Sequence, residues 1–174
     1  MVIIMFDIAF IVLARAVHVM AGVTWAGATF VLAAVIVPLA TRHAAEGAGR
    51  WMGLIASRAG MLSGISALLT VLSGIYLFAA LHPHDDSTGG LVLKVGSLAA
   101  LLAMAVGIAV GRPTGRKLAK LQEANAGGAA PSQDAIREMA VLRMRAMMSA
   151  RVATGLLVVA VLAMSVFRYV AAIG

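Results

Sequence analysis

The stretch FDIAFIVLARAVHVMAGVTWAGATFVLAAVIVPLA, residues 6–40, is almost continuously apolar and carries Arg15 and His18 in its first half. Roughly 20 apolar residues in a helix cross a bilayer core of about 30 Å, so this longer stretch predicts a transmembrane helix that tilts or extends beyond the membrane. Residues 1–14 are compatible with either an embedded or an interfacial start. An arginine and a histidine are costly in hydrocarbon, so their presence there indicates a functional site.

The composition is that of an integral membrane protein. Hydrophobic residues make up 62% of the chain, charged residues make up 12%, and the mean hydropathy is +1.00. These values lie far outside the range of soluble domains. Residues 59–81, 91–111 and 152–173 are three further apolar stretches that are long enough to cross a bilayer. With residues 6–40 they predict an all-α, integral membrane four-helix bundle that forms a single domain over residues 1–174, without a cleaved signal peptide.

Basic residues between the predicted spans indicate the orientation. Most of the 14 lysines and arginines fall in residues 41–58 and 112–151, whereas residues 82–90 have none and carry Asp85 and Asp86. The positive-inside rule places both basic segments in the cytoplasm and both termini on the outer side. We therefore expect a multi-pass protein of a bacterial-type cytoplasmic (inner) membrane. Topology also accounts for the net charge of +7, so no nucleic acid partner is expected.

The basic segment 112–151 and the glycines of the spans give local predictions. Arg112-Pro113-Thr114-Gly115 is expected to end or kink the third helix, residues 126–131 to interrupt the following short helix, and Ser132 to cap the fourth. Asp134 would lie in the first turn of that helix. Two pairs with small-xxx-small spacing are expected to bring helices close together: Gly60 with Gly64, and Gly107 with Gly111.

Polar residues from all four spans gather near the outer side once this topology is applied. They are Arg15 and His18 in the first span, His82 and His84 after the second, Lys94 in the third and Arg168 in the fourth. Lys94 and Arg168 can extend to the headgroups, and His82-Pro83-His84 can form a solvated turn. Arg15 lies too far from the start of its apolar stretch to do the same if that stretch is embedded.

A b-type haem is one cofactor that fits these residues. It needs an axial imidazole, an apolar slot and cations for its propionates. His18 can supply the imidazole, and Gly22 and Gly27 can open the slot. Arg15, Lys94 or Arg168 can meet the propionates. The second axial ligand stays open among Met20, Met61, Met104, Met164, His82 and none.

Copper is the alternative cofactor. His18, His82 and His84 would form an imidazole set facing the outer side, completed by Asp85, Asp86 or a methionine. Nitrogen and thioether ligands suit copper in either oxidation state. The chain has no cysteine, so thiolate metal sites and iron–sulfur ligation are excluded.

The first span also carries a family resemblance. Arg15-Ala16-Val17-His18, followed by Trp25-Ala26-Gly27, Pro38 and His43, resembles the first helix of CopD-type copper-resistance membrane proteins and their short four-helix relatives of unassigned function. HemJ-type protoporphyrinogen oxidases share a similar opening pattern, and Leu91-Val92-Leu93-Lys94 resembles the start of their third helix. Phe167-Arg168-Tyr169 is similar to the end of the short relatives.

The resemblance implies a helix bundle whose first-helix histidine ligates haem b or lies on a copper route across the membrane. His18 would be the haem or metal ligand, Trp25 its packing neighbour and Lys94 a partner for an anion. The long, basic and glycine-interrupted segment before the last span departs from the HemJ-type enzymes. The chain is also shorter than the CopD proteins.

Three functions follow as alternatives. In the first, the protein binds haem b and acts in membrane electron transfer, as a membrane oxidoreductase with a quinone or another redox partner. Alternatively, it binds or transports copper, or it is a structural or accessory subunit without a cofactor. A homo-oligomer is compatible with each alternative. Motifs of P-loop nucleotide binding, zinc proteases and serine hydrolases are absent from the sequence.

Overall fold

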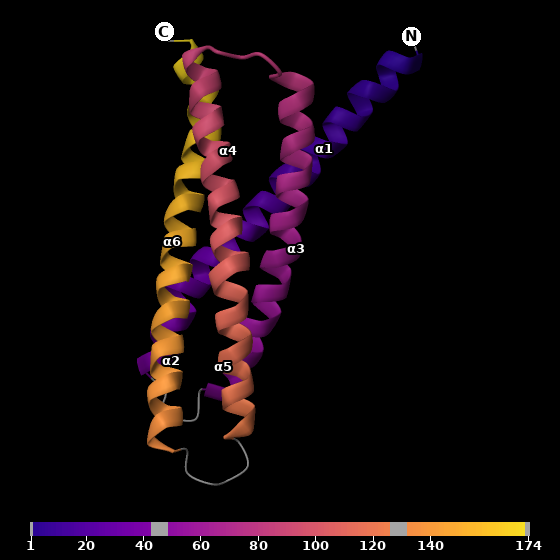
Figure 1. Ribbon diagram of the computed structural model, residues 1–174. Coiled ribbons are helices and arrows are strands. Elements are labelled where there is room, and N and C mark those ends of the chain that lie inside the picture. The colour runs from indigo at the N-terminus through magenta and orange to yellow at the C-terminus, as the bar shows by residue number, and fades with distance from the viewer. Residues whose placement is uncertain (1, 43–48, 126–131, 173–174) are drawn as a thin grey trace.

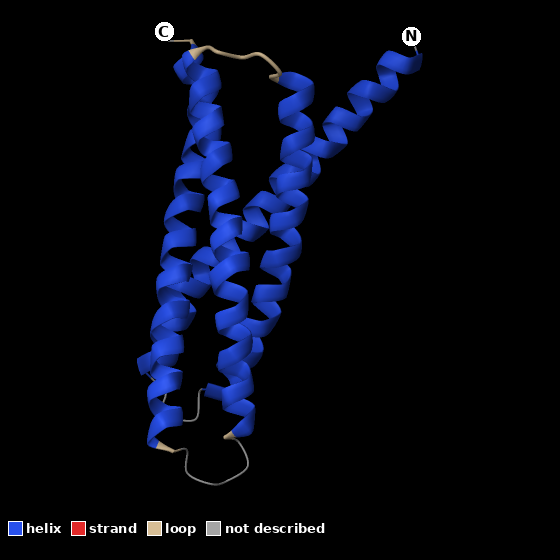
Figure 2. Ribbon diagram, in the orientation of Figure 1, coloured by secondary structure: helices blue, strands red, loops and turns tan. Residues whose placement is uncertain are grey.

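The computed structural model describes residues 2–42, 49–125 and 132–172, and these residues form helices and turns without a strand (Figure 2). The first rod comprises α1 (Val2–Val31), the π-helical segment η1 (Leu32–Ile36) and α2 (Val37–Arg42). The second is α3 (Gly49–Leu81). The third comprises α4 (Thr88–Val106), the π-helical segment η3 (Gly107–Gly111) and α5 (Arg112–Ala124). The fourth is α6 (Gln133–Ala171).

Within these residues, the predicted all-α class with four long apolar helices is confirmed. Each rod contains a helix that is long and apolar enough to cross a membrane. The start of α1, the end of α6 and the α3–α4 connection lie at one end of the bundle, here called the loop end (Figure 1). The basic helix α5 and the first part of α6 lie at the opposite end, here called the basic end.

The surface of the bundle suits lipid rather than water. Large apolar side chains are widely exposed, among them Met20 at 70% and Val23 at 68%, and among the described residues no large side chain is fully buried. A soluble monomer rarely exposes such extensive apolar area. A helical bundle satisfies its backbone polar groups internally, which is what a segment in hydrocarbon requires.

The helices form two tightly packed pairs, α1 with α3 and α4 with α6. Gly96 sets the α4–α6 distance, because a Cβ at this residue would lie 2.8 Å from the Cβ of Ala163. A small core joins the pairs at mid-height, where Trp25 is only 5% exposed. Trp25 shares this core with small or aliphatic residues of the other rods: Ala67, Ala99, Ala100, Ala103, Leu157 and Ala160.

The tight helix contact predicted at Gly60 and Gly64 is not seen, while η3 does approach α6, with Gly111 rather than Gly107 nearest to it. A Cβ at Gly60 or Gly107 would meet nothing within 4 Å, and the nearest atoms at Gly64 and Gly111 are 4.0 Å away. Gly107 continues the spacing of Gly96, Ala100 and Ala103 on α4, but the π-helical turn of η3 starts there and changes the rotation of the helix. The third rod nevertheless stays close to α6 along η3 and α5.

Residues 112–115 are predicted to end or kink the third helix, and the structure shows that the helix does not end there. Helical structure continues through η3 into α5, and Pro113 is the second residue after the π-helical turn. Pro38 has the same position after η1. A proline removes an amide donor and clashes with the carbonyl four residues earlier, which lies within the π-helical turn in both cases. The wider turn accommodates this defect, so the rod does not break.

The predicted start of the last helix is confirmed. The Ser132 hydroxyl accepts a hydrogen bond from the Ala135 amide at 3.2 Å, and Asp134 lies in the first turn of α6. An ion pair of 2.7 Å between Lys117 and Glu138 joins α5 to α6. Much of the predicted loop 112–151 is thus helical, while residues 126–131 lie outside the described residues.

Candidate functional site

The centre of the candidate site is the imidazole of His18, which bridges α1 and α3. Its Nδ1 lies 2.8 Å from the backbone carbonyl oxygen of Thr70. Because a carbonyl oxygen only accepts, Nδ1 carries the proton and donates. The Ser73 hydroxyl is 3.3 Å from the same nitrogen and donates its own proton to the Leu69 carbonyl at 2.6 Å. The tautomer that results leaves Nε2 with a lone pair, as in a metal-ligating histidine.

Gly74 allows the imidazole to lie directly against α3. A Cβ at Gly74 would be 2.8 Å from Cε1 of His18 and 3.2 Å from Nδ1, closer than real Cβ contacts allow. One turn further along α1, Gly22 faces α3, and a Cβ there would be 3.6 Å from the Thr70 methyl group. Gly74 therefore permits the close contact between the imidazole and α3, whereas a Cβ at Gly22 would make only an ordinary van der Waals contact.

His18 lies below the loop end rather than at it. Gly74 precedes the end of α3 at Leu81 by about 10 Å, from about 1.5 Å of rise per residue. The ring is half-buried, and neighbouring side chains on α1 such as Val19 are exposed and apolar. His18 is the one histidine among the described residues that is hydrogen-bonded between two long helices.

Arg15 lies one turn from His18 on the same side of α1 but is not part of this contact. Its side chain is exposed, and within the described part of the chain it has no hydrogen bond or ion pair. The beginning of α1 leans away from the other helices (Figure 1). Arg15 is therefore a cation beside the site that remains available to an anionic group.

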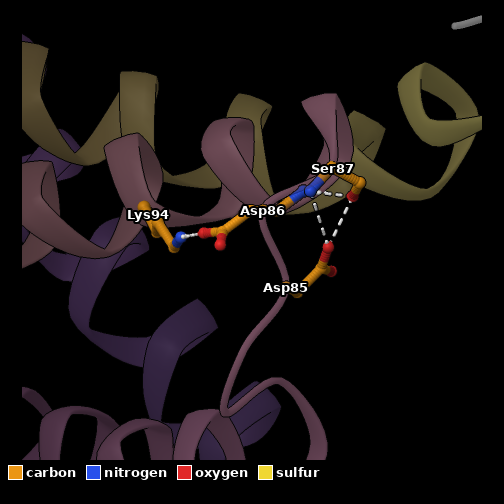
Figure 3. A network of polar contacts seen from close by, with 5 residues as sticks. Asp85, Asp86, Ser87 and Lys94 are labelled. Carbon is orange, nitrogen blue, oxygen red and sulfur yellow. Dashed lines mark hydrogen bonds and ion pairs between the residues drawn. The ribbon is translucent and has the colours of Figure 1, made fainter.

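The other two predicted cations have their own partners. Lys94 donates to Asp86 at 2.7 Å in an ion pair on the exposed α3–α4 connection (Figure 3). Arg168 is exposed, with its guanidinium carbon 5.9 Å from the centre of the Phe167 ring. The structure thus does not show Lys94 and Arg168 joined to His18.

The residues predicted as further copper ligands are also engaged separately. The His82 ring packs near Phe78 and Phe167, with ring centres 6.4 and 5.8 Å apart, and His84 is exposed. Nowhere in residues 2–42, 49–125 and 132–172 do three or more His, Asp or Glu side chains come together as a metal site. His18, His82, His84 and Asp85 are therefore not assembled around one ion.

Asp85 has a structural role at the start of α4. Its carboxylate accepts from the Ser87 hydroxyl at 2.5 Å and the Ser87 amide at 3.1 Å (Figure 3). The hydroxyl hydrogen bond, followed by the amide hydrogen bond, lowers the pKa of Asp85. Ser87 in turn caps α4 by accepting from Gly90, which has no room for a Cβ beside Asp85.

The remaining predicted haem-site residues are spread over the bundle. Trp25 belongs to the mid-height core, two turns from His18, and Gly27 has nothing within 4 Å of an added Cβ. Met104 packs against that core, and Met164 lies near Gly96. Met20 and Met61 are 70% and 58% exposed. The residues that the sequence did not single out as a site are Thr70, Ser73 and Gly74, which share one face of α3.

Comparisons with protein-family models, curated proteins and solved structures find no significant match to this chain. The resemblance to CopD-type and HemJ-type proteins stays a prediction from residues of the first, third and fourth spans.

Proposed function

We propose that this chain is a multi-pass protein of a bacterial-type inner membrane that binds haem b through His18 and takes part in membrane electron transfer. The observation that carries the proposal is the hydrogen bond from Nδ1 of His18 to the Thr70 carbonyl. Axial and metal-ligating histidines commonly donate their second nitrogen to a carbonyl, which fixes the ring and raises the basicity of the ligating nitrogen. Nε2 is then the ligand atom.

The surroundings of His18 meet some of the requirements of a haem site. The ring is held on a rigid helix, and the neighbouring apolar surface excludes water. Arg15, one turn away and without a partner in the described residues, would hold a propionate at the loop end. Lys94 and Arg168 are assigned smaller roles because each has another contact. Haem would supply a one-electron redox centre, and a quinone or another redox partner would exchange electrons with it.

The proposed orientation places the loop end outside and the basic end in the cytoplasm. Arg112 and Arg116 belong to α5 at the basic end, where the positive-inside rule expects basic residues. Copper binding has less support, because His18, His82 and His84 have separate surroundings in the structure.

Absorption spectra of the detergent-purified protein, oxidised and reduced, test the proposal. We expect a Soret band that is lost in His18→Ala and retained in His84→Ala, because His84 is an exposed histidine of the α3–α4 connection. A wild-type protein without a Soret band after growth with added haem precursor contradicts the proposal. Copper bound in such a protein would favour the copper alternative, and neither cofactor would favour a structural subunit.

A further inference from the structure

A second feature of the molecule lies beside the middle of α6, on the basic-end side of His18. An open cleft of about 320 Å³ separates the first rod from α6. Its lining comes from η1 and the start of α2 on one side and from α6 on the other: Ala33, Ala34, Pro38, Arg151 and Thr154. The walls are thus small and apolar, with one guanidinium at the rim.

The cleft lies at the depth of a membrane boundary. Arg151 precedes the loop-end terminus of α6 at Ala171 by about 30 Å at 1.5 Å per residue, which is the thickness of a bilayer core. Thr154 lies one turn closer to the loop end. A ligand in the cleft would therefore have a polar part at Arg151 and an apolar part toward Thr154.

Arg151 is available for an anion. Its side chain is exposed, and no hydrogen bond or ion pair engages it within residues 2–42, 49–125 and 132–172. The Thr154 hydroxyl donates to the Ala150 carbonyl at 2.8 Å and so retains acceptor capacity only. A guanidinium binds the oxygens of a phosphate through two parallel hydrogen bonds.

The surroundings of the cleft are apolar on the lipid side. Val35, Leu39 and Val152 flank it and are 46%, 44% and 49% exposed. The π-helical turn of η1 forms one wall, and such turns are often found at functional sites. A continuous apolar surface next to a cation matches an amphiphile with an anionic head rather than a free ion.

We propose that this cleft binds an anionic phospholipid, with the phosphate on Arg151 and an acyl chain along η1 and α6. The charge of Arg151, its depth and the exposed apolar wall support this occupant together. The site is independent of the proposed haem site, so His18→Ala should leave lipid binding unchanged.

Native mass spectrometry of the full chain in detergent, titrated with phosphatidylglycerol or phosphatidylcholine, tests the proposal. We expect phosphatidylglycerol to bind first. Arg151→Gln should weaken that binding by about tenfold or more, since a charge-assisted hydrogen bond contributes about 1.5–3 kcal/mol. Arg145→Gln removes an exposed arginine of α6 outside the cleft and should have little effect.

A second variant distinguishes the contribution of the cleft to lipid binding from that of the Arg151 charge. Ala33→Leu keeps Arg151 but fills the cleft, and it should also weaken phosphatidylglycerol binding while helicity by circular dichroism stays unchanged. Equal losses in Arg145→Gln and Arg151→Gln, or unchanged binding in a folded Ala33→Leu variant, would overturn the proposal. Displacement of the lipid by equimolar glycerol phosphate would overturn the lipid assignment.

Discussion

The position of a single imidazole defines the candidate site. The sequence predicts His18 as functional because histidine is costly in an apolar span, and the structure shows how α3 holds it. The Thr70 contact uses a backbone carbonyl, which any residue type supplies, so the sequence could not identify it. Gly74 could be found only by knowing which face of α3 meets α1.

Replacing Gly74 by alanine tests the packing of the His18 ring against α3. The new Cβ would lie 2.8 Å from His18 Cε1, so the ring must move away from the Thr70 carbonyl. We expect a loss of about 1–3 kcal/mol in the free energy of unfolding, as for other overpacked sites, and weaker haem retention. Thermal unfolding and haem content measure the two effects. Gly27→Ala is the matched control, because its Cβ meets nothing within 4 Å; equal behaviour of the two variants would refute this packing.

At the scale of the elements, two π-helical turns interrupt the regular rotation of the first and third rods. The sequence predicted glycine pairs as contacts from their spacing, but spacing assumes a regular helix. The π-helical turn η3 begins at Gly107, where an added Cβ would meet nothing within 4 Å, whereas Gly96 lies directly against α6. Pro113, which the sequence predicts to end or kink the third helix, follows η3, and Pro38 has the same position after η1. Rotation of this kind depends on tertiary packing and could not be derived from one sequence.

The α4–α6 contact gives a prediction for Gly96. In Gly96→Ala the new Cβ would lie 2.8 Å from the Ala163 Cβ and 3.3 Å from the Ala160 carbonyl oxygen. The backbone oxygen cannot rotate away, so we expect the helix pair to separate and the free energy of unfolding to fall by about 1–3 kcal/mol. Denaturation in detergent measures this. Gly107→Ala should be neutral or stabilising, and an equal loss there would contradict the assignment.

The start of α4 gives a prediction for how the stability of the protein depends on pH. Hydrogen bonds from Ser87 lower the pKa of Asp85 in the folded protein. A lowered folded-state pKa contributes stability above the unfolded pKa, and this contribution is lost as pH falls below about 4. We expect Ser87→Ala to reduce the acid-dependent change in melting temperature between pH 6 and pH 3. An unaltered pH profile in Ser87→Ala would show that the carboxylate is not stabilised by this hydroxyl.

At the scale of the whole molecule, composition and the lengths of the apolar stretches were enough to predict four long helices. Their pairing was not predictable, because apolar faces all resemble one another when lipid is the surrounding medium. The prediction that Arg15, Lys94 or Arg168 meets the haem propionates depends on how close the helices come at the loop end. The beginning of α1 leans away, and Lys94 pairs with Asp86 (Figure 1).

The proposed orientation can be tested by labelling introduced cysteines without background labelling, since the chain has no native cysteine. We expect a membrane-impermeant maleimide added to intact cells to label His84→Cys at the loop end. Ser132→Cys at the basic end should react only after the membrane is permeabilised. The reverse pattern would show that the basic end faces outward.

The central claim is that Nε2 of His18 ligates haem, and chemical rescue tests it most directly. His18→Gly removes the ligand and leaves a space beside Gly74 into which free imidazole can enter. The measurement is the Soret spectrum of purified His18→Gly during titration with imidazole. We predict a band that is absent without imidazole and restored by it. A Soret band in His18→Gly that is identical to that of the wild type before imidazole is added would contradict ligation by His18.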